Sequence, residues 1–384
     1  MQELKILLNQ KAKLVDGYKV VEFGHKEKAL LLEGEHYKII PITTDLRKIY
    51  LEVTTKCNFD CITCIRNSWN ENLGHMDMTI FNKLLMSLSE LEELETVHLG
   101  GFGEPLSHPK ILTIIEQLKR RNIRVELITN GALLSHEMNR ELIGLGVDYI
   151  YVSIDSSIAR DYSIIRRGGD LNQVIQNILG LNELRTNKSP YFPKLGIAFV
   201  AMKSNLSNLS NLMKLANRLK ADRVSISNVL PYNKELVDET LYDMEDAQFP
   251  FSIDVVHATI ANMKLRSYRR CKFIEQKSVS VNWQGDVVPC YSLLHSYKCY
   301  IYGREKQISK SSFGNIIDRS LKEIWNEPKF VNFRYRVKDN QFPSCTDCKW
   351  LEGCSYTDDN QADCWGNEPS CADCLWYKEI IICP

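Results

Sequence analysis

The chain reads Ile49-Tyr-Leu-Glu-Val-Thr-Thr-Lys-Cys-Asn-Phe-Asp-Cys-Ile-Thr-Cys64 where an apolar run meets three closely spaced cysteines. Residues 49–53 predict a short β-strand. Cys57, Cys61 and Cys64 follow this strand with the spacing C-x3-C-x2-C. Parallel α/β folds place their chemistry in the loops at the carboxyl ends of strands, so this position favours a functional role for the three cysteines.

Three thiolates on one short loop can bind three corners of a [4Fe–4S] cubane and leave the fourth iron without a protein ligand. Such an open position is needed if the metal is to touch a substrate or a cofactor. A zinc site would normally close with a fourth ligand nearby, and the nearest candidate, His75, lies eleven residues away. The spacing therefore predicts a [4Fe–4S] cluster with an open iron, and a structural metal knuckle is the alternative.

Outward from this loop, strand and amphipathic helix patterns alternate as far as residue 231. Strands are expected at 49–53, 96–99, 124–128, 149–154, 196–201 and 223–226. Helices are expected at 78–93, 109–121, 135–144, 171–185 and 206–220. Six strand–helix units with short connections predict a parallel sheet, and six units fall short of a closed eight-unit barrel. The expected fold class is α/β, with a partial (β/α)6 TIM-like barrel.

This barrel sets the expected domain organisation. Residues 1–46 hold short apolar runs broken by glycines and predict a small β unit. The barrel is expected over 47–232 and a helical connector over 233–270. Residues 271–384 are irregular and rich in Cys, Trp, Gly and Pro. Because this last segment has little periodic apolar sequence, bound metal must supply part of its folding free energy.

Composition narrows the class of protein. The 384 residues carry 48 basic and 48 acidic side chains, which is not the charge footprint of a nucleic-acid or membrane-surface binder. The sequence has no run of 18 apolar residues and no export signal. We therefore expect a cytoplasmic protein without a nucleic-acid or membrane partner. Thirteen cysteines in such a chain indicate metal ligands rather than disulfides, and ten of them follow residue 270.

The cysteine loop resembles the signature of the radical S-adenosylmethionine (SAM) superfamily, which has C-x3-C-x2-C after the first barrel strand. The family usually has an aromatic residue before the third cysteine, whereas Thr63 stands there in this chain and the aromatic Phe59 comes earlier. The resemblance implies that SAM binds at the open iron. It also implies a partial barrel with the SAM site at the carboxyl ends of its strands.

Further short motifs follow the other expected strands. Gly100-Gly-Phe-Gly-Glu-Pro105 resembles the family motif that holds the methionine amino group, with Glu104 as the carboxylate and Gly100, Gly101 and Gly103 giving close backbone approach. Tyr162-Ser-Ile-Ile-Arg-Arg-Gly-Gly169 resembles a family turn whose arginine, Arg166 here, pairs with a carboxylate. For the polar residues Thr129, Asn130, Ser153 and Asp155, which end two further expected strands, capping of the strand end is the alternative role. The remaining candidates for SAM binding are Thr129, Asn130, Ser153, Asp155 and Leu230.

The C-terminal cysteines carry a second resemblance. The spacing C-x13-G-x4-C, then C-x2-C-x5-C, resembles the SPASM extension of radical SAM maturases, which implies two auxiliary [4Fe–4S] clusters. The expected ligands are Cys271, Cys290, Cys345, Cys348, Cys354, Cys364, Cys371 and Cys374. Asp358 stands where the family has its next cysteine, so either Asp358 or Cys364 closes a cluster. Cys299 and Cys383 are surplus, and a zinc ribbon is the alternative for this segment.

Short phrases add a narrower resemblance. Cys371-Ala-Asp-Cys-Leu-Trp376, Ile381-Ile-Cys-Pro384 and the run from Cys57 to Trp69 resemble radical SAM maturases associated with tungstopterin oxidoreductases. This implies a maturase that reductively cleaves SAM and takes hydrogen from a protein, peptide or pterin-type substrate, with ferredoxin or flavodoxin as electron donor. A peptide-modifying or sulfatase-maturing enzyme is the alternative. A further alternative is a non-catalytic scaffold that binds iron–sulfur clusters or zinc.

Overall fold

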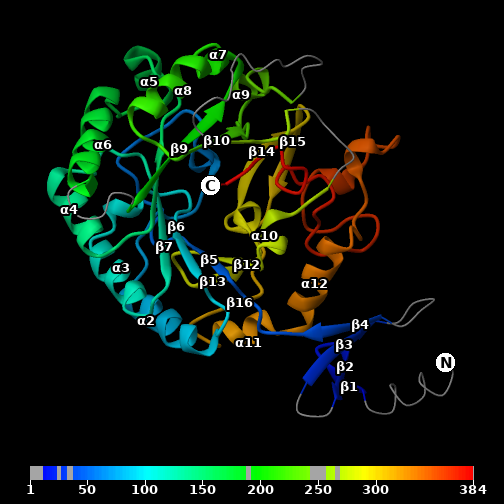
Figure 1. The fold of residues 1–384 in the computed structure, drawn as a ribbon. Coiled ribbons are helices and arrows are strands. Elements are labelled where there is room, and N and C mark those ends of the chain that lie inside the picture. The colour runs from blue at the N-terminus through cyan, green and yellow to red at the C-terminus, as the bar shows by residue number, and fades with distance from the viewer. Residues whose placement is uncertain are drawn as a thin grey trace.

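The computed structural model describes residues 12–23, 27–32, 38–186, 192–242, 257–263 and 269–383. Its main feature is a ten-stranded sheet with the order β11-β10-β9-β8-β7-β6-β5-β12-β13-β16. The sheet curves, helices cover its outer side, and the end of the chain lies near the centre of the ring (Figure 1).

Six consecutive strands carry the predicted barrel. They are β5 (Lys48–Leu51), β6 (Thr96–Leu99), β7 (Arg124–Thr129), β8 (Tyr149–Ser153), β9 (Lys194–Ala201) and β10 (Arg223–Asn228). Each pairs in parallel with the next. Most of their residues are buried, as expected for parallel strands covered on both faces. The prediction of a partial TIM-like barrel is confirmed.

Amphipathic helices cover the outer face of this sheet. They are α2 (Met78–Ser87), α3 (Ile111–Lys119), α4 (His136–Gly144), α5 (Ala159–Ile165), α6 (Leu171–Thr186), α7 (Lys203–Leu206) and α8 (Leu209–Arg218). In α3 the buried residues Ile111, Ile114, Ile115 and Leu118 have the spacing of one helix face. Side-chain caps begin other helices, as where Ser135 accepts a hydrogen bond from the backbone N–H of Met138.

The sheet continues beyond the barrel at both ends. At one end β11 (His257–Ile260) pairs in parallel with β10, although its range was expected to be a helical connector; α9 (Lys234–Asp238) is the helix described there. At the other end β12 (Ser278–Val281) pairs in parallel with β5. The Cys-rich segment therefore contributes a strand to the barrel sheet, and β13 (Asp286–Val288) and β16 (Gly314–Asn315) extend the sheet with antiparallel pairing.

The N-terminal unit is a separate four-stranded antiparallel sheet. Its strands are β1 (Ala12–Val15), β2 (Tyr18–Phe23), β3 (Glu27–Leu32) and β4 (Lys38–Ile42). Val20 and Leu30 of this sheet cluster with Val331 of α12 (Pro328–Lys338). The unit thus packs against the C-terminal part of the chain, as Figure 1 shows near its lower edge.

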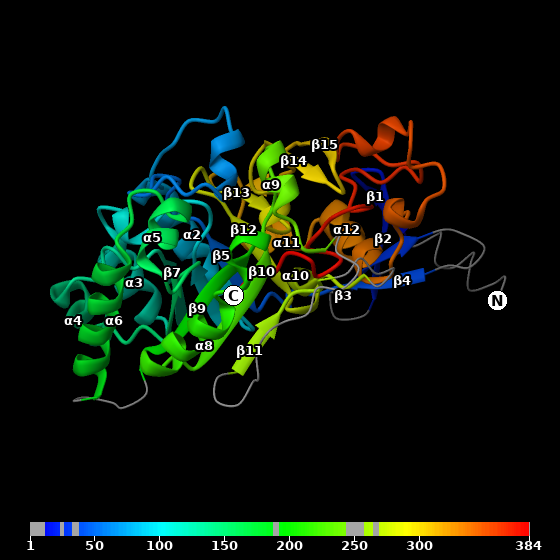
Figure 2. The ribbon, with the colours of Figure 1, turned by 90° about the horizontal axis from the view of Figure 1, so that it is seen from above.

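The rest of the C-terminal segment has little regular structure. It contains α10 (Lys272–Glu275), the hairpin of β14 (Tyr297–Ile301) and β15 (Arg304–Ile308), and α11 (Leu321–Trp325). Its last residues return to the barrel, where the chain end lies beside β10 (Figure 2). In the parts of the chain that the structure describes, no helix has the length and apolar character needed to cross a bilayer.

Candidate active site

A cavity of about 290 Å³ lies at the carboxyl ends of the barrel strands. One wall is made by Cys61, Thr63 and Cys64 of the cysteine loop, and strands β7 to β10 together with the segments that follow β6, β7, β8 and β10 supply most of the others. The last residues of the chain, from Trp376 to Cys383, contribute to the remaining side. The cavity is thus built from segments separated by more than 300 residues.

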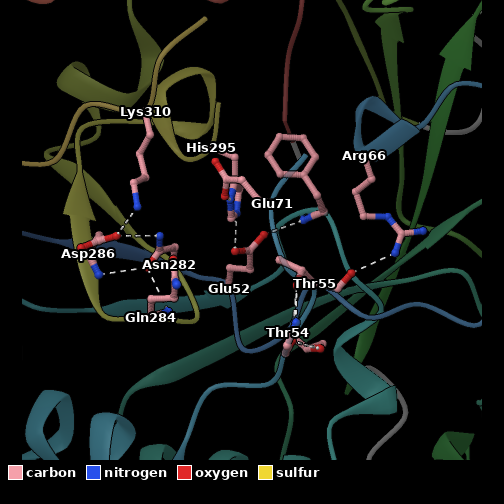
Figure 3. Close-up of polar contacts among 12 residues, drawn as sticks. Glu52, Thr54, Thr55, Arg66, Glu71, Asn282, Gln284, Asp286, His295 and Lys310 are labelled. Atoms are coloured by element: carbon pink, nitrogen blue, oxygen red, sulfur yellow. Dashed lines mark hydrogen bonds and ion pairs between the residues drawn. The ribbon is translucent and has the colours of Figure 1, made fainter. Parts of the chain in front are cut away.

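Arg66 holds the cysteine loop in shape. Its guanidinium donates to the carbonyl oxygens of Thr55 at 2.9 Å and Phe59 at 3.0 Å, and its Nε lies 3.4 Å from the Sγ of Cys64. Figure 3 shows Arg66 reaching back to Thr55. Burial raises the pKa of Cys61 to about 11. The free thiol is therefore protonated at neutral pH, and binding iron must displace its proton.

Glu104 lies at the back of the cavity and is 2% exposed. Its carboxylate accepts hydrogen bonds from the Thr129 hydroxyl at 2.7 Å, from the Asn130 N–H at 2.7 Å and from the Leu106 N–H at 3.1 Å. Burial raises the pKa of Glu104 to about 6 even though these hydrogen bonds lower it. A buried carboxylate of this kind is stabilised when a cation binds beside it.

The preceding glycines allow two loops to pack closely. Gly101 has φ +107°, and a Cβ there would lie 2.6 Å from Cγ of Glu52. A Cβ on Gly103 would collide with the backbone carbonyl of Thr54. Larger residues at these positions would therefore push the Glu104 loop away from the cysteine loop.

Arg166 lies in the cavity wall and pairs with Asp155. Its Nη2 is 2.7 Å from Oδ2 of Asp155, which raises the pKa of Arg166 although burial acts to lower it. The other carboxylate oxygen of Asp155 accepts the N–H of Val200 at 2.8 Å. The Nε of Arg166 is buried and has no hydrogen-bond partner. A buried donor without a partner is costly, so it favours an anionic ligand in the cavity.

The structure brings most of the predicted SAM-binding residues together. Those that line the cavity are Gly101, Gly103, Glu104, Thr129, Asn130, Ser153, Arg166 and Leu230. Gly100 instead packs against Tyr291, since a Cβ there would lie 2.8 Å from the tyrosine oxygen. Asp155 lies behind Arg166. Phe59 is buried against Gly169, whereas Thr63 faces the cavity.

Several cavity residues were not predicted. They are Ile65, Phe102, Ile128, Ala198, Phe199, Val200, Ser225, Ser227, Asn228, Trp376, Ile381, Ile382 and Cys383. Ser225 and Ser227 alternate along β10, so their period of two was a signal that one face of this strand is polar. The C-terminal residues gave no such signal because only the fold brings them to the barrel.

One set of C-terminal cysteines gathers beside a second, smaller cavity lined by Cys290, Cys299, Cys371 and Cys374. Burial raises the pKa values of Cys271, Cys290 and Cys371, and the nearby thiol of Cys374 raises each of them further. Among the described residues, no three potential ligands are close enough together to hold a single metal ion. A cubane keeps its thiolate ligands farther apart than a single ion does.

A second set lies nearer the surface. Burial raises the pKa of Cys345 to about 12, with further contributions from Asp373, Cys364 and Cys354. Cys348 shares the turn of Cys345, donating its N–H to the Cys345 carbonyl at 3.2 Å. The structure thus brings Cys271, Cys290 and Cys371 near Cys374, and it brings Cys354 and Cys364 near Cys345. Cys299, which was expected to be surplus, lies with the first set.

A buried histidine joins the Cys-rich segment to the cysteine loop. Nε2 of His295 lies 2.7 Å from Glu52, and its Nδ1 lies 2.7 Å from Glu71 (Figure 3). Glu52 precedes the cysteine triad and Glu71 follows it. Burial lowers the pKa of His295, but the two carboxylates outweigh this effect and raise it to about 9. At neutral pH the ring is therefore a cation between two anions. Sequence reasoning missed this contact.

Comparison with known proteins identifies the class. The family model of the radical SAM superfamily matches residues 51–193, and that of the SPASM iron–sulfur cluster-binding domain matches residues 271–349. The chain belongs to the radical SAM superfamily and is a radical SAM enzyme whose cofactors are SAM and iron–sulfur clusters. This confirms the predicted class and overturns the alternative of a non-catalytic scaffold.

Particular relatives narrow the comparison. The chain is 35% identical over 347 residues to the tungsten-containing aldehyde ferredoxin oxidoreductase cofactor-modifying protein of Pyrococcus furiosus, covering 88% of this chain and 97% of that protein. Two solved structures share the fold. SuiB of Streptococcus suis, bound to the precursor peptide SuiA, has a TM-score of 0.55 at 14% identity, covering 81% of this chain and 71% of SuiB. The protein anSMEcpe, with bound AdoMet, has a TM-score of 0.55 at 18% identity, covering 87% and 92%.

Proposed function

We propose that this protein uses radical SAM chemistry to modify the cofactor of a tungsten-containing oxidoreductase. The observation that carries this proposal is the 35% identity spanning 97% of a relative named as a cofactor-modifying protein of such an enzyme. The C-terminal phrases that resemble tungstopterin maturases agree with it. The proposed electron donor is a small low-potential protein such as ferredoxin or flavodoxin.

Different cavity residues bind different groups of SAM. Glu104 binds the ammonium group, because its carboxylate is buried and carries a charge at neutral pH. Arg166 binds the carboxylate through its unpartnered Nε, while Asp155 positions the guanidinium from behind. Asn130 and Ser153 offer polar contacts to the ribose, and Thr129 orients Glu104. Leu230 packs against the adenine.

The cysteine loop fits a [4Fe–4S] cluster because Cys61 and Cys64 face this cavity and Cys57 lies on the same loop. When bound, the cluster supplies the electron that cleaves SAM to methionine and a 5′-deoxyadenosyl radical. Phe102 and Phe199 provide apolar wall that limits access of water to a reactive radical. The chain thus positions the reactants, and the cofactor supplies the difficult chemistry.

We propose two auxiliary clusters. The way the thiols lie near one another supports the ligands assigned to each cluster. One cluster is held by Cys271, Cys290, Cys371 and Cys374. The other is held by Cys345, Cys348, Cys354 and Cys364. Both side chains are exposed, and Cys364 is preferred to Asp358 because it interacts electrostatically with Cys345.

The first test concerns SAM cleavage. The anaerobically reduced protein is expected to convert SAM to methionine and 5′-deoxyadenosine, measured by liquid chromatography. The triple variant Cys57→Ala, Cys61→Ala, Cys64→Ala should lose this activity, because no thiolate remains to hold the reducing cluster. Equal cleavage by the variant would contradict the assignment.

The second test concerns the substrate. The tungsten-pterin cofactor, free or within its oxidoreductase, is incubated with the reduced protein and SAM. A mass change in the cofactor that requires both is the expected result. A mass change in a peptide or in the partner polypeptide, with an unchanged pterin, would instead identify the peptide-modifying alternative.

A further inference from the structure

A fourth thiol lines the candidate active site. Cys383 lies in the wall of the cavity that also contains Cys61 and Cys64. The C-terminal segment is fixed to the end of β10. Nδ2 of Asn228 donates to the carbonyl of Ile380 at 2.8 Å, and the N–H of Ile382 donates to the hydroxyl of Ser227 at 3.0 Å. The position of Cys383 therefore follows from contacts made across more than 150 residues.

Two buried polar atoms show that this cavity is built for a ligand. Nε of Arg166 and Oδ1 of Asn228 have no hydrogen-bond partner, although both residues line the cavity. Asn228 is 2% exposed and Arg166 is 9% exposed. Unpaired buried groups of this kind destabilise the protein unless a ligand satisfies them. Cys383 thus faces a binding site and not an incidental gap.

The Cys383 thiol is held in its neutral form. Burial raises its pKa to about 11, although the Nε1–H that Trp376 donates to its sulfur at 3.4 Å and the charges of Lys48 and Lys272 act to lower it. Among the described residues that line the cavity, none is a histidine or a lysine that could accept its proton. At neutral pH Cys383 therefore carries an S–H bond and is neither a thiolate nucleophile nor a ready metal ligand. An S–H bond is weaker than an aliphatic C–H bond, so a carbon radical can take its hydrogen.

Trp376 connects this thiol with the auxiliary region. Its side chain is buried and lines both the active-site cavity and the smaller cavity of Cys290, Cys371 and Cys374. It follows Cys374 by two residues. The indole thus forms part of the wall between the two cavities and contacts the sulfur of Cys383 directly.

We propose that Cys383 is a catalytic hydrogen-atom donor to carbon radicals in this cavity and that Trp376 is its positioning and electron-relay partner. The proposal rests on the proposed radical SAM function. A carbon radical takes the hydrogen atom of Cys383, which forms one C–H bond, breaks the S–H bond and leaves a thiyl radical. One electron from a reduced iron–sulfur cluster and one proton from water restore the thiol.

The test needs no identified substrate, because the 5′-deoxyadenosyl radical is itself a carbon radical formed in the cavity. The cluster-loaded protein is reduced in D2O with SAM alone, where Cys383 becomes S–D. We expect the released 5′-deoxyadenosine to contain one deuterium, measured by mass spectrometry. In Cys383→Ser the label should fall to background, since an O–D bond is too strong to be broken by an alkyl radical. Cys383→Ala should behave in the same way.

Each outcome has a distinct meaning. Production of 5′-deoxyadenosine with undiminished label in both Cys383 variants overturns the proposal, as does an unlabelled product from the wild type. No 5′-deoxyadenosine from the wild type removes the proposed function, and this inference falls with it. The control is Cys299→Ser, because that buried cysteine lies outside this cavity, and it should retain the label.

Two further measurements test separately whether Cys383 lies beside bound SAM and whether Trp376 is needed to regenerate its thiol. In the unreduced protein, Cys383→Trp should weaken SAM binding at least tenfold in calorimetry, because the larger side chain fills part of the cavity that Cys383 lines; unchanged affinity would place the thiol outside the site. Trp376→Phe should give labelled product only in its first turnover, because the thiyl radical is then not reduced. Continued labelling at the wild-type rate would remove Trp376 from the electron path.

Discussion

Glu104 shows how a single buried carboxylate links the cavity to the loops that support it. Three donors from two loops orient its oxygens, yet burial still raises its pKa to about 6. The charged form is therefore less stable in this buried position than in water. A bound ammonium group would offset this cost. The charged carboxylate therefore favours ligand binding, although its burial does not stabilise the fold.

This residue predicts a pH dependence of SAM binding. Because Glu104 is protonated below about pH 6, SAM affinity should rise between pH 5 and pH 7 and then level off. Glu104→Gln keeps an acceptor for Thr129 but removes the charge, so it should weaken binding by about 1.5–3 kcal/mol and abolish the pH dependence. Calorimetry on the unreduced, cluster-loaded protein measures both effects.

The matched control is Glu116→Gln on the exposed face of α3, where the carboxylate pairs with Arg120. This variant should bind SAM like the wild type. Unchanged affinity in Glu104→Gln would place the ammonium group elsewhere.

At the scale of elements, the contact of His295 with Glu52 and Glu71 joins three segments. Glu52 follows β5 and also accepts the N–H of Phe102 at 3.1 Å, so it orients the loop after β6 as well. The ring of Trp69 stacks on His295 with centroids 4.1 Å apart. Lys310 acts with His295 to lower the pKa of Glu71, although burial acts to raise it. The loops on both sides of the triad are thereby tied to the SPASM segment.

The raised pKa of His295 predicts how stability changes with pH. Its contribution is fully present below the unfolded pKa of about 6.5 and is lost as the pH rises through about 9. The difference corresponds to about 3 kcal/mol. His295→Gln should therefore be less stable than the wild type at pH 7, with a gap that narrows toward pH 10. Thermal unfolding of the two proteins from pH 6 to pH 10 measures this gap.

His136→Gln is the control, because His136 is exposed at the start of α4. It should unfold like the wild type throughout this pH range. A gap between His295→Gln and the wild type that stays constant with pH would show that the imidazole acts through its packing alone.

At the scale of the whole molecule, the barrel and the Cys-rich segment are interlocked. They share one sheet through β5 and β12, and the chain end returns to β10. The N-terminal sheet packs on α12 of the same segment. Loss of metal from the C-terminal region should therefore disturb the structure of the active-site cavity, because that region supplies one of the cavity's walls.

The number of auxiliary clusters gives the prediction at this scale. The triple variant that lacks Cys57, Cys61 and Cys64 should retain about eight iron atoms after anaerobic reconstitution, four for each cubane. A further loss of Cys345 and Cys348 should lower the count to about four. Metal and acid-labile sulfide analysis decides the outcome, and zinc with almost no iron would instead indicate a zinc ribbon.

The sequence by itself determined the barrel and its cysteine loop. Buried parallel strands are short apolar runs and covering helices are amphipathic, so each element is encoded in consecutive residues. The predicted strands consequently agree with β5 to β10 to within two residues at either end. The spacing of Cys57, Cys61 and Cys64 is likewise local, because all three thiols lie on one loop. Motifs at successive strand ends then converge, since parallel strands share one edge.

Only the tertiary structure decided which distant residues complete the site. Cys383 and Trp376 reach the cavity through contacts with β10, and His295 meets Glu52 across 243 residues. The approach of Cys371 to Cys290, that of Cys345 to Cys364, and the pairing of Asp155 with Arg166 also depend on how the chain folds back. Sequence spacing constrains geometry only within a loop or an element. Beyond that range, packing and hydrogen bonding of the whole chain determine which side chains meet.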